Sequence, residues 1–112
     1  MVEPKSNYRI WKYEVPMKER FTLDLPQGFR ILGADVQRND EDRIYMWVLH
    51  DITQPIIKCV PFVMVGTGNT ITVDPMKLAH VATVQHRTFV WHIFLRGVAP
   101  NLATRIIEEE QG

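Results

Sequence analysis

Apolar and polar residues alternate one by one through several short segments of this chain, and turn-forming residues separate those segments. In residues 8–15, for example, Trp11, Tyr13 and Val15 alternate with charged neighbours. Successive side chains of a β-strand point to opposite faces, so this period of two is typical of a half-buried strand. Residues 20–25 and 30–37 repeat the alternation, and further strand-like segments rich in β-branched and aromatic residues cover 43–50, 56–65, 70–73, 79–85 and 88–96.

About seven short strands with almost no helix indicate an all-β fold, a small antiparallel sandwich or a partly open barrel. The length of 112 residues is typical of one domain. We expect residues 1–7 to form a loose N-terminus and residues 101–112 a tail with a short helix capped by Asn101. Pro61 interrupts the segment 56–65 and predicts an edge position or a bulge there.

The segment 43–50 is apolar on both faces. One face carries Ile44, Met46 and Val48, and the other carries Tyr45, Trp47 and Leu49. A sandwich strand normally turns one face to the core and the other to water. We therefore expect Tyr45, Trp47 and Leu49 to form an interface with a second copy of the chain. The alternative is that a C-terminal helix covers this face.

Five short motifs follow one another between about residue 10 and residue 96. They are Ile10-Trp11-Lys12-Tyr13-Glu14, then Pro26-Gln27-Gly28 with Ile31-Leu32, then Trp47, then Val65-Gly66-Thr67-Gly68, and last Val90-Trp91-His92-Ile93-Phe94. In this order and spacing the chain resembles a family of small bacteriophage and prophage proteins, a domain of unknown function. The resemblance implies a phage gene product inside a bacterial host, and it transfers no catalytic residue.

Charge and cysteine content bear on the partners and the cellular compartment to expect. The formal net charge is zero, with 13 basic and 13 acidic residues, which gives no argument for a nucleic-acid or membrane partner. Cys59 is the only cysteine, so no intrachain disulfide forms, which fits a reducing compartment. The polar first nine residues are not typical of a signal peptide. We therefore expect a cytoplasmic protein of an infected bacterial host.

A glycine-containing loop, Gly66-Thr67-Gly68-Asn69, follows the segment 56–65. Glycine lets backbone N–H groups approach an anion closely, so this loop is a candidate ligand-binding site. The dinucleotide fingerprint needs a third glycine and a following helix, and here Thr70 to Val73 follows instead. A tight turn without a ligand is the alternative.

Histidines and the lone thiol are the remaining candidates for chemistry. His50, His80, His86 and His92 are spaced 30, 6 and 6 residues apart, which lacks the close pairs typical of metal sites. We assign His80 and His92 to the candidate ligand site and predict no metal site. Cys59 lies among apolar neighbours, which predicts a buried, unreactive thiol.

The sequence thus favours a binding or interaction protein, because no pair of titratable residues is placed as acid and base. Its expected partners are a second copy of the chain, a host protein or a small anionic ligand, and no cofactor is expected. The alternative is a small-barrel enzyme acting on a phosphorylated or nucleotide-like ligand at the Gly66–Asn69 loop.

Overall fold

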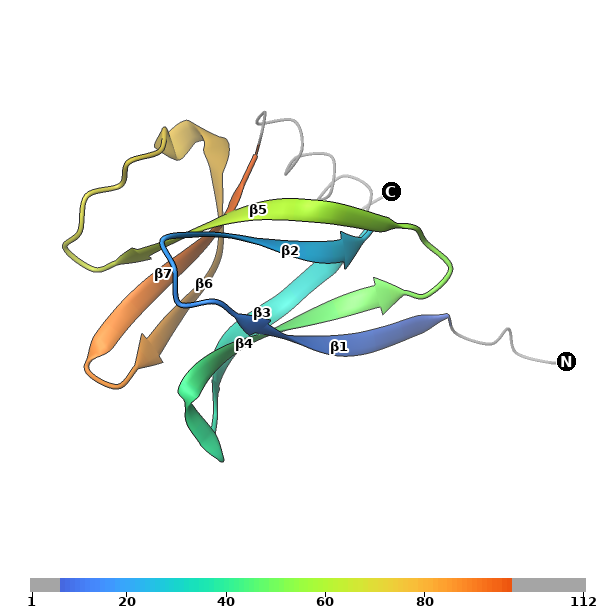
Figure 1. The fold of residues 1–112 in the computed structure, drawn as a ribbon, viewed down its shortest axis with the longest axis horizontal. Helices are drawn as coiled ribbons and strands as arrows, with labels where there is room; N and C mark the ends of the chain where they lie inside the picture. The colour runs from blue at the N-terminus through green and yellow to red at the C-terminus, as the bar shows by residue number, and fades with distance from the viewer. Residues whose placement is uncertain (1–6, 98–112) are drawn as a thin grey trace, which may run out of the picture.

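A computed structural model describes residues 7–97, which form seven strands in two antiparallel sheets (Figure 1). The strands are β1 (Tyr8–Val15), β2 (Arg20–Pro26), β3 (Arg30–Gln37), β4 (Asp40–Asp51), β5 (Ile56–Gly66), β6 (Leu78–His86) and β7 (Phe89–Arg96). One sheet has the order β1-β4-β3 and the other β2-β5-β7-β6. The all-β prediction is confirmed, and the described strands form a sandwich rather than a closed barrel.

Two predicted terminal features lie wholly or largely outside the described residues. These are the C-terminal tail with its short helix, residues 101–112, and residues 1–6 of the N-terminus. The described residues include no helix with the length and apolar character needed to cross a bilayer.

Most strand bounds agree with the sequence prediction, and two segments differ. The predicted loop 38–42 is shorter, because β3 and β4 stay paired as far as Gln37 and Asp40. The predicted strand 70–73 is absent from the structure. Instead that segment leads into a single 3-10 turn, η1 (Pro75–Lys77), where the side chain of Asp74 accepts a hydrogen bond from the backbone N–H of Met76 at 3.0 Å.

The main core lies between the two sheets. Ile44, Met46 and Val48 of β4 are fully buried, and they pack with Phe62 and Met64 of β5 and with Ile93 and Leu95 of β7. Burying one such side chain stabilises the fold by about 1.5–3 kcal/mol. The face of β4 that carries Ile44 is therefore the core face, and the face that carries Trp47 points outward.

A second, smaller core lies on the outer face of the four-stranded sheet. Val63 and Val65 of β5 are buried there against Val73, with Leu78 and Phe94 packed around them. Val73 belongs to the long connection between β5 and β6, so this connection folds back over the sheet. This explains why β5 is apolar on both faces and why residues 70–73 need no strand partner.

The bulge predicted near Pro61 is present. The β2–β5 register shifts between Leu23 and Leu25, and Cys59 opposite adopts a left-handed backbone with φ of 58°. The backbone N–H of Cys59 donates to the Asp24 carboxylate at 2.8 Å. The prediction that Cys59 is buried is wrong, because the bulge leaves it exposed. Strand β5 is paired with β7 only from Phe62 onward, so Pro61 interrupts no ladder on that side.

Candidate functional site

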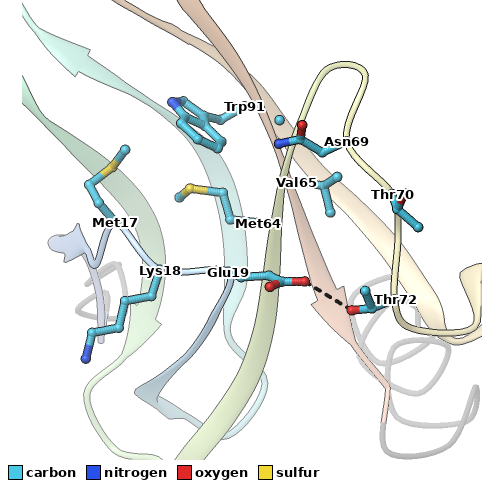
Figure 2. Close-up of a pocket in the computed structure, with 10 residues that line it drawn as sticks. Met17, Lys18, Glu19, Met64, Val65, Asn69, Thr70, Thr72 and Trp91 are labelled. Carbon is cyan, nitrogen blue, oxygen red and sulfur yellow. Dashed lines mark hydrogen bonds between the residues drawn. The ribbon is translucent and has the colours of Figure 1, made fainter.

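A cavity of about 570 Å³ opens where β5 loses its partner β2 (Figure 2). The β2–β5 pairing stops at Arg20 and Val63, and the last contact is a 2.8 Å hydrogen bond from the N–H of Met64 to the carbonyl of Glu19. Beyond that point the loop before β2 and the loop after β5 diverge and leave a hollow. It is lined by Met17, Lys18, Glu19, Met64, Val65, Gly66, Asn69, Thr70, Thr72 and Trp91.

Gly66 is needed for the close packing beside this cavity. It pairs across the sheet with Trp91. A Cβ on Gly66 would lie 2.8 Å from Nδ2 of Asn69 and 3.2 Å from Cζ3 of the Trp91 ring, and both distances are shorter than ordinary contacts. The missing side chain therefore lets the indole and the Asn69 amide approach the strand. The structure thus gives a packing reason for glycine at position 66.

The cavity has an apolar wall and a polar wall. Met17, Met64 and Trp91 form the apolar one, and in Figure 2 the Met17 side chain extends toward the indole while Lys18 extends away from it. Asn69, Thr70 and Thr72 stand opposite. The hydroxyl of Thr72 donates to the Glu19 carboxylate at 3.0 Å and links the two loops. The Glu19 carboxylate at the cavity is thus a hydrogen-bond acceptor that Thr72 holds in place.

The Gly66–Asn69 loop is a tight turn in which two backbone N–H groups are bonded to backbone carbonyls of the protein. The N–H of Thr67 donates to the carbonyl of Val90 at 3.0 Å, and the N–H of Asn69 donates to the carbonyl of Gly66 at 3.0 Å. Gly68 has a φ of 89°, a conformation that favours glycine. Gly66 and Asn69 line the cavity, whereas Thr67 and Gly68 do not.

The two predicted ligand-site histidines lie on the outer face of the four-stranded sheet, in one hydrogen-bonded row. His80 Nε2 is 2.8 Å from the Thr83 hydroxyl, which is 3.1 Å from His92 Nδ1, and His92 Nε2 is 2.8 Å from the Thr67 hydroxyl. The structure thus brings the three residues together: Thr83 links His80 to His92, and Thr67 contacts His92 directly. Thr83 carries no signal of its own in the sequence, because only the β6–β7 register places it opposite His92.

The predicted interface residues lie on the outer face of the three-stranded sheet, and they differ in exposure. Trp47 and Leu49 are partly exposed. Tyr45 is buried, because the Lys12 ammonium lies 4.5 Å from its ring centroid and its hydroxyl donates to Asp40 at 2.7 Å. That hydrogen bond raises the pKa of Tyr45. Of the three predicted interface residues, Tyr45 is thus the one that is buried within the single chain.

Two exposed apolar side chains stand on that same outer face instead. Ile10, opposite Leu49, is 62% exposed, and Leu32, beside Trp47, is 48% exposed. The sequence alternation identifies Ile10 as a residue of this face. The position of Leu32 depends on a register shift between Ile31 and Gly33, which no sequence pattern revealed.

Within the part of the chain that the structure describes, no group of three or more His, Cys, Asp or Glu residues is placed to hold a metal ion. His50 is buried and stacks on Trp11, with ring centroids 5.3 Å apart.

The two sheets and the cavity define a small antiparallel β-sandwich domain with a ligand-sized hollow beside β5, where the β2–β5 pairing ends. The chain belongs to the family described as a domain of unknown function, DUF7352, which matches residues 6–102. This agrees with the predicted relation to a domain of unknown function and carries no indication of a phage origin. No curated protein and no solved structure matches the chain.

Proposed function

We propose that this protein binds a small planar molecule in the cavity between the 16–19 loop and the Gly66–Asn69 loop. The observation that carries the proposal is the cavity itself. Its volume of about 570 Å³ lies within the range of about 300–1,000 Å³ usual for small-molecule sites. Such sites combine apolar walls with a few placed polar groups, and this one sets Met17, Met64 and Trp91 against the Asn69 amide.

The chemistry of the walls favours a flat heteroaromatic ligand. Thioether sulfur atoms make favourable contacts with aromatic rings, so Met17 and Met64 suit the face of such a ligand. Asn69 offers both a donor and an acceptor, and the Glu19 carboxylate, held by Thr72, accepts from N–H groups. A nucleobase-like compound presents this combination of a flat face and a polar edge.

The same walls argue against a phosphorylated ligand and an enzymatic role. Two of the loop N–H groups, those of Thr67 and Asn69, are already bonded within the protein. The Glu19 carboxylate would repel a phosphate brought into the cavity. The row containing His80 and His92 lies outside the cavity lining, so neither imidazole is placed beside a molecule bound there. We therefore favour binding over catalysis.

The wider setting of this function rests on the sequence alone. We propose that the protein is phage-encoded and acts in the bacterial cytoplasm, either by holding a small molecule or by engaging a host factor. The resemblance supports the phage origin, and the single cysteine supports a reducing compartment.

Isothermal titration calorimetry tests the binding proposal. We expect adenine to bind the full chain saturably and inorganic phosphate to give no binding heat. Met17→Glu and Asn69→Ala should each weaken adenine binding by about tenfold or more, equivalent to about 1.4 kcal/mol. Met76→Glu is the matched control, because Met76 is 83% exposed and lies outside the cavity lining. Phosphate binding without adenine binding would favour the enzyme alternative and overturn the proposal.

A further inference from the structure

The cavity beside β5 runs along a stretch of that strand's edge which β2 leaves uncovered. The β2–β5 pairing ends just before Met64, whose N–H donates to the Glu19 carbonyl at 2.8 Å. Continued by two residues, the same register would place Met17 opposite Gly66. Residues 16–18 instead form a tight turn, in which the N–H of the last residue donates to the carbonyl of the first at 2.9 Å. The chain therefore turns away before it can pair with β5 beyond Met64.

The backbone groups of Met64 and Gly66 point toward this open edge. On the other edge of β5, the Thr67 N–H donates to the Val90 carbonyl of β7 at 3.0 Å. Hydrogen-bonded and non-hydrogen-bonded pairs alternate along an antiparallel ladder, so Gly66 and Met64 turn their N–H and C=O groups away from β7. Glycine has no side chain, so the atoms with which Gly66 lines the cavity are backbone atoms.

Each of these two residues uses one backbone group and leaves the other unpaired. The Met64 N–H is bonded to Glu19, and the Gly66 C=O accepts from the Asn69 N–H at 3.0 Å. Among the described residues, no hydrogen-bond donor meets the Met64 C=O and no acceptor meets the Gly66 N–H. Both residues are buried, and Met64 is only 3% exposed. Buried backbone groups are almost always paired in native proteins, so an unpaired acceptor beside an unpaired donor indicates a place for a ligand.

The open stretch of the β5 edge is too short for a peptide strand. Its ends are closed by the bond to Glu19 on one side and by the bond from Asn69 on the other. Strand addition to a sheet edge uses a row of main-chain hydrogen bonds, whereas this edge offers one acceptor and one donor. A small ring with one donor beside one acceptor, both pointing the same way, satisfies the two groups. Adenine has such an edge, where the N6 amino group donates and the ring nitrogen N1 accepts.

The walls of the cavity suit a flat ring bonded to this edge. Ladder hydrogen bonds lie in the plane of the sheet, so a ring that replaces the missing strand lies in that plane as well. Met64 packs on the inner side of the sheet, where Trp91 also lies, and Val65 packs on the outer side. Figure 2 shows the Met64 and Trp91 side chains on one side of the strand and Val65 on the other. The ring would therefore have apolar side chains against both of its faces.

We propose that the Met64 C=O and the Gly66 N–H determine the specificity of the cavity by binding the N6 amino group and N1 of a 6-aminopurine. This recognition rests on the binding function proposed above and narrows its ligand to planar rings with a donor next to an acceptor. Main-chain groups make both contacts, and glycine at position 66 lets a ligand approach the strand closely.

Isothermal titration calorimetry of the full chain with a series of purines tests this recognition. Adenine should bind, and 1-deazaadenine, which lacks N1, should bind more weakly by about tenfold or more. Purine, which lacks the amino group, should lose affinity by a similar factor. In each case one buried backbone group of the protein stays unpaired. The matched control is 7-deazaadenine, which keeps both groups and should bind about as tightly as adenine.

A scalar coupling measured by nuclear magnetic resonance tests the Gly66 contact directly. With ¹⁵N in both the chain and adenine, a hydrogen bond from the Gly66 N–H to N1 gives a cross-peak between the two nitrogen atoms. The Asn69 N–H, which is bonded within the protein, is the internal control and should give none.

A backbone substitution tests the same contact without changing a side chain. Glycolic acid in place of Gly66 removes this N–H, and the full chain can be assembled by ligating residues 1–58 to residues 59–112 at Cys59. The ligated chain with glycine at this position is the matched control. In the glycolic acid chain, adenine should bind no more tightly than 1-deazaadenine, and circular dichroism shows whether that chain is folded.

The outcomes separate this recognition from the binding function on which it rests. If adenine binds saturably but gives no cross-peak, or if 1-deazaadenine binds as tightly as adenine, the recognition by Met64 and Gly66 is wrong and the binding function stands. The recognition is also wrong if 7-deazaadenine, rather than 1-deazaadenine, loses affinity, because the N7 edge would then face β5. If neither adenine nor any of its analogues binds, the proposed binding function fails together with the recognition.

Discussion

Replacing Gly66 by alanine should destabilise the protein by about 1 kcal/mol, as the net result of two opposing effects. The new Cβ would lie 3.2 Å from Cζ3 of the Trp91 ring, which is part of a rigid side chain in a packed sheet. Overpacking of this kind costs about 1–3 kcal/mol. Gly66 does not have a left-handed backbone, so alanine fits its conformation. Alanine also makes the unfolded chain less flexible, which stabilises the folded protein by about 0.4–1 kcal/mol.

Urea unfolding followed by circular dichroism measures this difference in the free energy of unfolding. The shorter contact, 2.8 Å to Nδ2 of Asn69, involves the end of a flexible side chain that can move away. The rigid indole therefore sets the cost. In a Trp91→Phe background, Gly66→Ala should cost less than in the wild-type background, whereas an Asn69→Ala background should change its cost little.

This reasoning is refuted if Gly66→Ala stabilises the protein. It is also refuted if Gly66→Ala costs the same with tryptophan or phenylalanine at position 91. In either case the close approach of the indole would not be what requires glycine at this position.

Three further predictions concern the β5 bulge and the β4–β5 turn. Cys59→Gly should raise the free energy of unfolding by up to about 1 kcal/mol, because glycine adopts the left-handed backbone freely, whereas the control Cys59→Ala should not. Asp24→Ala should lower that free energy by about 1 kcal/mol in urea unfolding, because it removes the acceptor of the Cys59 N–H; an unchanged midpoint would contradict this. Hydrogen bonds from the Thr53 hydroxyl and N–H lower the pKa of Asp51 in the folded protein. The ionised Asp51 carboxylate therefore stabilises the fold above its unfolded pKa of about 3.9, and this stabilisation is lost as the pH falls through the lower folded pKa. Melting temperatures of the wild type and Asp51→Asn should thus converge in acid, and a constant difference would contradict the assignment.

The strands were predictable because their signals are local. Alternation in residues 8–15 and 30–37 gives the bounds of β1 and β3 without any knowledge of their partners. Residues 70–73 show the limit of this signal. Their apolar and β-branched composition is typical of a strand, but Val73 is buried by packing on the outer face of the sheet rather than by pairing.

The surfaces were less predictable because they depend on register and on loops that meet in space. Tyr45 is buried because Lys12 of β1 lies over its ring and Asp40 accepts a hydrogen bond from its hydroxyl. Cys59 is exposed because a bulge shifts the register opposite Asp24. Glycine content identified the Gly66–Asn69 loop, but the cavity beside it also needs the 16–19 loop, and no sequence motif connects the two.

Binding in the cavity is tested most directly by nuclear magnetic resonance of the ¹⁵N-labelled full chain. The chain has 3 tryptophans, so the indole N–H signals form a small, assignable set. Titration with adenine should shift the signals of the Trp91 indole and the Asn69 side-chain amide saturably, while the Trp47 indole signal stays in place. If the Trp91 and Asn69 signals do not move, or if only the Trp47 signal moves, the cavity is not the binding site.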